Sequence, residues 1–151
     1  MITVQREKWI ECIDEIMPLC CAVHGLVEKD LYGLELDFDV DLYQELDASD
    51  AFHCIVMREN NKPIGFHWIV VAPLLRFKGY FQAGTDAIYV HPDHRKHSMK
   101  LIQYSESYIK SIGCKTWALA TLDPEYRGDM WQRKGFKKSE TNFIKVLKCH
   151  Q

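Results

Sequence analysis

The chain contains no apolar run that approaches the roughly 18 residues expected of a membrane-spanning helix. Its six cysteines include no C-x-x-C pair, so the spacing typical of zinc ribbons and dithiol redox sites is missing. Repeats, low-complexity segments and linker-like stretches are also missing. The net charge of -2 gives no global reason to expect binding to nucleic acid or to an anionic membrane. These absences favour a single globular domain over residues 1–151.

The composition is that of an ordinary globular protein. Hydrophobic residues make up 47% of the chain and charged residues 26%, which is enough to bury a real core. Several cysteines lie on apolar faces of the predicted elements, and we interpret them as buried thiols in a reducing compartment. The first residues alternate charged with apolar side chains and do not form a signal peptide. We therefore expect a cytoplasmic protein without membrane association.

Hydrophobic periodicity predicts a mixture of helices and strands. Apolar positions step at helical spacing over residues 8–23, where Pro18 is expected to kink the helix or divide it into two. A short helix follows, with Asp39 or Asp41 as its N-cap. The expected strands are 1–5, 52–58, 64–71, 80–83, 85–90, 115–121 and 140–147, and the expected later helices are 101–112 and 124–134. Mainly antiparallel strands mixed with helices in this order make an α+β sandwich.

The segment Ile88–Lys100 carries the most information about function. A β-branched run stops at a His-Pro-Asp sequence, and a basic turn then opens a helix whose apolar face begins at Leu101. The first backbone N–H groups of a helix lack intrahelical partners and carry the positive pole of the helix dipole, so they suit an anion. Arg95, Lys96 and Lys100 add positive charge around them. The pattern predicts a phosphate cradle, and the alternative is a solvated basic turn that caps a surface helix.

This segment resembles the acetyl-CoA loop of the GNAT superfamily of N-acetyltransferases, in which a strand ending in Val-x-Pro-x-x-Arg leads into Arg-x-x-Gly-x-Gly/Ala. Val90, Pro92 and Arg95 match that pattern position by position. Ser98 stands where the first glycine is usual, and Lys100 where the second glycine or alanine is usual. Glycine lets the backbone approach a pyrophosphate closely and adopt positive φ without cost, so these two departures bear on activity.

Further features agree with the order of motifs in the superfamily. Asp86 precedes the strand end where many members carry an acidic residue that acts as general base or binds the substrate amine. Trp131 opens a Trp-Gln-Arg-Lys-Gly-Phe sequence similar to the late Tyr-x-x-x-Gly-Phe of the family. The resemblance implies the GNAT fold, a central and mostly antiparallel twisted sheet flanked by helices. Within the superfamily, residues 86–95 and 135–140 are similar to segments of the small acetyltransferase-like proteins of tailed bacteriophages.

The resemblance also implies an activity: transfer of the acetyl group of acetyl-CoA to a primary amine of a small molecule or protein. It implies Asp86 as the catalytic base. Tyr126 is the candidate for the proton donor at the thiolate leaving group, because Trp131 occupies the usual place of a tyrosine. The residues alone leave open a strand-end hydrogen bond for Asp86 and a surface position for Tyr126. The implied cofactor-binding residues are Ile88, Tyr89, Val90, Arg95, Lys96, His97, Ser98, Met99, Lys100 and Trp131.

A rival hypothesis is a GNAT-fold protein that has lost transfer activity and serves as a virion or host-interaction component. Ser98, Lys100 and Trp131 favour it, as does Pro124 near the place of an asparagine that often contacts the cofactor. His67, on an apolar strand, is either another candidate base or a core histidine. An exposed sheet edge leaves room for a homodimer, which the resemblance makes an expectation.

Two other kinds of partner are not expected. His91, His94 and His97 crowd a turn without the i, i+4 helical spacing of a zinc site, so we predict no metal. The basic turn and the late cluster at residues 133–138 do not make a basic face large enough to neutralise many phosphates, so we predict no nucleic-acid binding.

Overall fold

A computed structural model describes residues 1–121 and 128–147. The chain forms one five-stranded sheet in the order β1-β2-β3-β4-β5. Neighbouring strands are antiparallel except for β4 and β5, which are parallel. The strands are β1 (Ile2–Glu7), β2 (Phe52–Glu59), β3 (Lys62–Pro73), β4 (Phe81–Val90) and β5 (Thr116–Ala118). This mixed sheet flanked by helices confirms the predicted α+β class.

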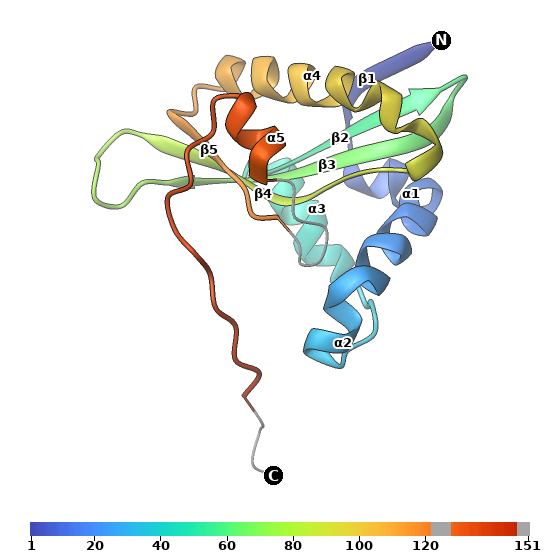
Figure 1. Cartoon of the computed structure of the whole chain (residues 1–151), viewed down its shortest axis with the longest axis horizontal. Coiled ribbons are helices and arrows are strands. Elements are labelled where there is room, and N and C mark those ends of the chain that lie inside the picture. The colour runs from blue at the N-terminus through green and yellow to red at the C-terminus, as the bar shows by residue number, and fades with distance from the viewer. Residues whose placement is uncertain (122–127, 148–151) are drawn as a thin grey trace.

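Helices cover both faces of the sheet. In Figure 1, α4 crosses one face while α1 and α3 lie on the other. The helices are α1 (Trp9–Val23), the π-helix η1 (His24–Glu28), α2 (Lys29–Tyr32), α3 (Val40–Ala48), the 3-10 helix η2 (Pro92–His97), α4 (Ser98–Ser111) and α5 (Gly128–Arg133). Asp39 is the N-cap of α3, because its carboxylate accepts a hydrogen bond from the backbone N–H of Leu42. Among the described helices, none is long and apolar enough to span a membrane.

The side chains of β2 pack into the hydrophobic cores on both faces of the sheet. Successive side chains of a strand point to opposite faces, so a strand covered on both sides is apolar throughout. Cys54 and Val56 belong to the core beneath α1, whereas Ile55 and Met57 belong to the core beneath α4. All four side chains are completely buried. The continuous apolar run therefore reflects burial on both faces.

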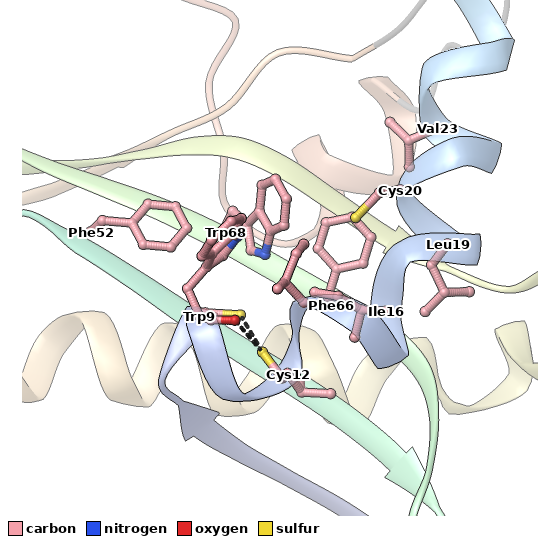
Figure 2. Close-up of a cluster of buried hydrophobic side chains, with 12 residues drawn as sticks. Trp9, Cys12, Ile16, Leu19, Cys20, Val23, Phe52, Phe66 and Trp68 are labelled. Carbon is pink, nitrogen blue, oxygen red and sulfur yellow. Dashed lines mark hydrogen bonds between the residues drawn. The ribbon is translucent and has the colours of Figure 1, made fainter. Parts of the chain in front are cut away.

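The core beneath α1 is rich in aromatic rings (Figure 2). Trp9 stacks on Tyr43 of α3 with ring centroids 4.3 Å apart, and Tyr43 meets Trp68 at 5.6 Å. Cys12 and Cys54 bring their sulfur atoms to 3.7 Å, far beyond the roughly 2.05 Å of a disulfide, so both are thiols. The prediction of buried thiols is confirmed for these two residues.

Three predicted elements have different bounds in the structure. The helix α1 includes Pro18, so the alternative of two helices meeting there is wrong. The separate strands expected at 80–83 and 85–90 are one strand, β4, which a bulge interrupts without ending it. The strand β5 is shorter than the predicted 115–121. For β4 and β5 the neighbouring strand decides the boundary and the local pattern does not.

The predicted strand at 140–147 is wrong. These residues form no strand and leave the sheet as an extended segment (Figure 1). Phe143 is 91% exposed and Leu147 is 77% exposed, although both belong to a β-prone sequence. A strand needs the edge of a neighbour, and β5 makes its described pairing with β4 alone.

Candidate functional site

A cavity of about 480 Å³ lies where β4, η1, α4 and α5 meet. It is bounded by the carboxyl half of β4, the start of α4, the end of α1 and η1. Its walls are mainly apolar. They consist of Val23, Leu26, Glu28, Thr85, Asp86, Ala87, Ile88, Tyr89, Val90, Arg95, Ser98, Met99, Leu101, Ile102, Ala120, Thr121, Met130 and Trp131. A cavity of this size with few polar groups is typical of a small-molecule site.

The strands β4 and β5 separate along one wall of this cavity. They pair only where residues 82–84 of β4 meet residues 116–118 of β5. Beyond Gly84, β4 keeps its ladder with β3 but pairs with no described strand on its other side. The backbone of residues 85–90 therefore presents an open edge to the cavity, and an extended ligand with amide groups is able to pair with such an edge.

Asp86 occupies a β-bulge at this edge. Trp68 of β3 lies opposite Ala87 and Ile69 lies opposite Thr85, so Asp86 between them has no partner residue in β3. A bulge of this kind re-aims a side chain and is common beside active sites. The side chain of Asp86 is exposed toward the cavity that it lines.

The surroundings of Asp86 raise the pKa of its carboxyl above the ordinary value. Although the residue is exposed to the cavity, the surrounding protein removes part of the water around the carboxyl, and this desolvation is the larger cause; the negative charge of Glu28 adds to it. The charge of Asp86 in turn contributes, after burial, to raising the pKa of the Tyr43 hydroxyl to about 12. A carboxyl with a raised pKa is a stronger base than an aspartate with the ordinary value.

Glu28 reaches the cavity because of the π-helix η1, which continues α1 without a break. A π-helical turn alters the helical register, and such turns are frequent at functional sites. Nδ1 of His24, at the start of η1, lies 3.6 Å from a carboxylate oxygen of Glu28. The sequence analysis missed Glu28 because 3.6-residue periodicity carries no sign of a π-turn.

The basic turn contributes another part of the cavity wall. It forms the 3-10 helix η2, which leads directly into α4. Nε of Arg95 donates to the carbonyl of Val90 at 3.3 Å, and the guanidinium lies 6.0 Å from the ring centre of Tyr89. These contacts hold Arg95 against the end of β4, where it lines the cavity together with Ser98 and Met99.

The backbone conformation at Ser98 does not require glycine. Ser98 has φ -54° and ψ -35°, ordinary right-handed helical values, and its N–H bonds to the carbonyl of Arg95. Positive φ occurs at several described residues, none of them within 88–100. The conformational reason for glycine at positions 98 and 100 therefore does not apply here.

Three residues of the predicted cradle do not line the cavity. Lys96 and Lys100 are exposed on the outside of the turn. His97 places Nε2 3.8 Å from a carboxylate oxygen of Glu59 in β2, and His94 makes a closer contact of 2.9 Å with the same carboxylate. These histidines fix the turn to the end of the β2–β3 hairpin, and among the described residues no group of three or more possible metal ligands comes together.

Trp131 lies in α5 and closes another wall of the cavity. Its side chain is buried and meets Trp117 of β5 and Phe136 edge to face, with ring centres 6.1 and 5.3 Å away. The indole has no acidic proton to give a leaving thiolate. The other candidate donor, Tyr126, and Pro124 lie outside the described residues.

His67 lies beneath the site, not inside it. Its ring is completely buried, and its two nitrogens lie 2.8 Å from Oγ of Ser105 and 2.7 Å from Oγ1 of Thr85. Burial lowers the pKa of His67 to about 3. Of the two roles left open by the sequence, the structure supports the core histidine, because both ring nitrogens are already engaged.

The sequence also belongs to a known family. The model of the Acetyltransferase (GNAT) family matches residues 21–136, most of the chain. The protein is therefore a member of the GNAT acetyltransferase family, whose enzymes use acetyl-CoA. The match includes the turn, the bulge and the Trp131 helix. No curated protein matches the sequence.

Solved structures with the same fold cover nearly the whole chain. A ribosomal-protein-alanine N-acetyltransferase from Brucella melitensis biovar Abortus 2308 shows a TM-score of 0.72 at 16% identity, covering 99% of this chain and 100% of its own. An aminoglycoside acetyltransferase from an uncultured soil metagenomic sample shows 0.77 at 16% identity and 97% coverage of both chains. An aminoglycoside N-acetyltransferase in complex with CoA shows 0.68 at 14% identity, with 97% and 100% coverage. At these identities the likeness establishes the fold.

Proposed function

We propose that this protein is an acetyl-CoA-dependent N-acetyltransferase that acetylates a primary amine of a cationic small molecule or protein. One observation carries the proposal. A single cavity joins a basic turn at a helix start to an aspartate on the bulge of an open strand edge. Phosphate binding, amide pairing and proton removal are the three tasks of amine acetylation by a thioester, and one cavity brings together groups suited to each.

The cofactor-binding end consists of the turn and the open edge of β4. Arg95 and the Ser98 hydroxyl line the cavity and are suited to the pyrophosphate, while exposed Lys96 and Lys100 add long-range attraction for the phosphates. The backbone of Ile88, Tyr89 and Val90 pairs with the amides of the pantetheine arm, and one of its N–H groups polarises the thioester carbonyl. Met99 and Trp131 supply apolar contacts.

The acceptor end consists of Asp86 and Glu28. Asp86 accepts a proton from the bound ammonium, and the free amine attacks the thioester carbonyl carbon. The carbon–sulfur bond then breaks, the acetyl group stays on nitrogen, which releases its second proton to solvent, and CoA leaves as a thiolate that takes up a proton. We assign that proton to the Tyr126 hydroxyl, since Trp131 has none to give.

The charge at the acceptor end favours a cationic acceptor. Glu28 adds a second carboxylate to that of Asp86, and Arg95 is the only lysine or arginine among the described residues that line the cavity. An acceptor with a second positive charge is thus able to pair with Glu28 while Asp86 serves the reacting amine. Two of the solved structures above are named as acetyltransferases of aminoglycosides, which are polycationic amines.

Calorimetric titration of acetyl-CoA into the protein tests the first part of the proposal. Binding at micromolar acetyl-CoA is expected, with loss of binding in an Arg95→Ala, Ser98→Asp double variant. Lys110→Ala removes an exposed charge from the far end of α4 and is the matched control. Acetyl transfer is then compared between a triamine and a neutral monoamine, and no binding at millimolar acetyl-CoA would exclude the enzyme.

A second candidate function rests on Trp131. With an indole in the place of the usual tyrosine, we infer as the alternative a GNAT-fold protein without transfer activity, which serves as a virion or host-interaction component if a phage encodes it. Binding of acetyl-CoA without transfer to any amine would support this alternative. For either function we expect the protein in the cytoplasm.

A further inference from the structure

The turn η2 and the first residue of α4 alternate side chains that line the cavity with side chains that face the sheet. Arg95 and Ser98 line the cavity. The residue before each of them is a histidine that lies against Glu59 at the end of β2. Nδ1 of His94 lies 2.9 Å from one carboxylate oxygen of Glu59, and Nε2 of His97 lies 3.8 Å from the other. Each residue assigned to the pyrophosphate therefore directly follows a residue held by the same carboxylate.

Glu59 belongs to a well-connected part of the sheet. It ends β2, where it pairs with Ile2 of β1 and with Lys62 of β3. The N-terminal amine donates to Oδ1 of Asn60 at 2.8 Å, and the N–H of Asn60 donates to the carbonyl of Met1 at 3.1 Å. Strands that are paired on both sides are among the last parts of a protein to open, so this carboxylate is a fixed point for the turn beside it (Figure 1).

The turn has few strong bonds of its own. It is a 3-10 helix, whose hydrogen bonds have poorer geometry than those of an α-helix. Its N-cap residue is tied to β3, since the N–H of His91 donates to the carbonyl of Ile64 at 2.8 Å. Near its other end, Nε2 of His97 is buried and forms no hydrogen bond within the described part of the chain. Glu59 is the anionic group beside that nitrogen, so its removal leaves this end of the turn uncompensated.

We propose that Glu59 is a positioning residue for cofactor binding: its carboxylate holds η2 so that Arg95 and Ser98 face the pyrophosphate of acetyl-CoA. The inference rests on the proposed function and extends it, because Glu59 itself does not line the cavity. A turn that is held in place before the ligand binds needs less ordering on binding, which raises affinity. The three side chains in these contacts are 19–33% exposed, so solvent ions screen them less than a fully exposed pair.

The sign of the effect separates positioning from simple charge. Acetyl-CoA is a polyanion, so the loss of a nearby negative charge strengthens binding if long-range attraction alone matters. Loss of the anchor weakens binding instead, and Glu59→Ala distinguishes the two explanations. Asp93→Ala is the matched control, because it removes a carboxylate from the same turn. The side chain of Asp93 is 83% exposed, and its charged neighbour is His91 at 3.8 Å.

Calorimetric titration of acetyl-CoA is the first test. Glu59→Ala is expected to weaken binding by about 2–10-fold, which corresponds to ordering one side chain on binding. Asp93→Ala should bind equally well or more tightly. The pair His94→Ala and His97→Ala should weaken binding as Glu59→Ala does, and combining all three substitutions should add little, because the anchor is already lost. Equal or tighter binding by Glu59→Ala, with normal binding by the unaltered protein, would overturn this inference and leave the proposed function intact.

A donor without phosphates separates positioning from general damage to the fold. S-acetylpantetheine lacks the pyrophosphate, so kcat/KM for this donor should be unchanged in Glu59→Ala, whereas kcat/KM for acetyl-CoA should fall. Equal losses with both donors would overturn the inference.

Amide hydrogen exchange tests the anchor without any ligand. Residues 94–98 should exchange faster in Glu59→Ala than in the unaltered protein, and unchanged exchange would overturn the inference. If the unaltered protein binds no acetyl-CoA, the proposed function fails and the role of Glu59 in cofactor binding fails with it, even where the exchange result shows the anchor itself.

Discussion

Nε2 of His67 lies 2.7 Å from Oγ1 of Thr85, and this contact joins the buried layer of the sheet to the wall of the cavity. Oγ1 of Thr85 also accepts a hydrogen bond from the indole N–H of Trp117 at 2.8 Å. On the other side of the imidazole ring, Nδ1 of His67 lies 2.8 Å from Oγ of Ser105 in α4. One polar chain therefore links β5, β4, β3 and α4 directly beneath the bulge at Asp86.

The buried ring predicts a pH-dependent stability. Burial lowers the pKa of His67 from 6.5 to about 3, so the folded protein holds it neutral while the unfolded chain binds a proton near pH 6.5. The unfolded state then binds more protons in this interval, and the free energy of unfolding falls as pH drops from 6.5 toward about 3. Urea unfolding as a function of pH should show this fall, and His67→Gln should flatten it. An unchanged pH slope in the variant would contradict the assignment.

Thr85 is predicted to contribute through its hydroxyl. Thr85→Val keeps the shape but leaves the indole N–H of Trp117 and a nitrogen of His67 without a partner, and buried unpaired polar groups each cost about 1–3 kcal/mol. Thr85→Ser keeps the hydroxyl and is the control. Denaturant unfolding should separate the two variants, whereas equal stabilities would show that the polar chain contributes little.

Gly65 is predicted to be required for the spacing of β3 and β4. A Cβ on Gly65 would lie 2.9 Å from the carbonyl oxygen of Tyr89, which is backbone and cannot move alone. Gly65→Ala should therefore displace the end of β4 and lower stability by about 1–3 kcal/mol, the usual cost of overpacking. Gly84→Ala is the control on β4, where the nearest atom is 3.7 Å away. Thermal unfolding should give a lower Tm for Gly65→Ala than for Gly84→Ala, and titration should give weaker acetyl-CoA binding for Gly65→Ala.

The turn and the helix after it could be predicted because their signals are local. The His-Pro-Asp break, the basic residues and the apolar face from Leu101 all lie within one segment, and Ser98 and Met99 do line the cavity. Lys96 and Lys100 carried the same signal but are exposed, since charge in a sequence does not say which way a side chain points on a helix.

The part of the cavity formed by Glu28 and Asp86 could not be predicted to the same degree. Glu28 reaches the cavity through a π-turn, and Asp86 projects from a bulge that exists only because β3 and β4 differ by one residue in register. The bulge depends on pairing between strands, and the π-turn leaves no sign in a 3.6-residue periodicity. Residues 140–147 show the converse, because the segment has strand propensity but no strand partner within the described part of the chain.

Asp86 and Glu28 together predict the pH profile of acetyl transfer. Burial and the charge of Glu28 both raise the pKa of the Asp86 carboxyl above 3.8. The base works only when ionised, so kcat/KM should rise with pH along a limb that lies above that value. Asp86→Asn should lower kcat by about 10²–10⁴-fold, the usual contribution of a general base. Acetyl-CoA affinity should be unchanged, because the proposed phosphate contacts come from Arg95 and Ser98 and do not include Asp86.

Glu28→Gln separates electrostatic from steric effects of Glu28 on the rising limb of the pH profile of kcat/KM. The substitution keeps the size of the side chain and removes its negative charge, so the pKa of Asp86 should fall and the rising limb should move to lower pH. KM for a triamine should rise, while KM for a monoamine should change little, because only the triamine has a second charge to pair. Glu106→Gln, on the outer face of α4, is the matched control. A rising limb that does not move in Glu28→Gln would show that burial alone raises the pKa of Asp86. An equal change of KM for the triamine and the monoamine would show that Glu28 does not bind the acceptor.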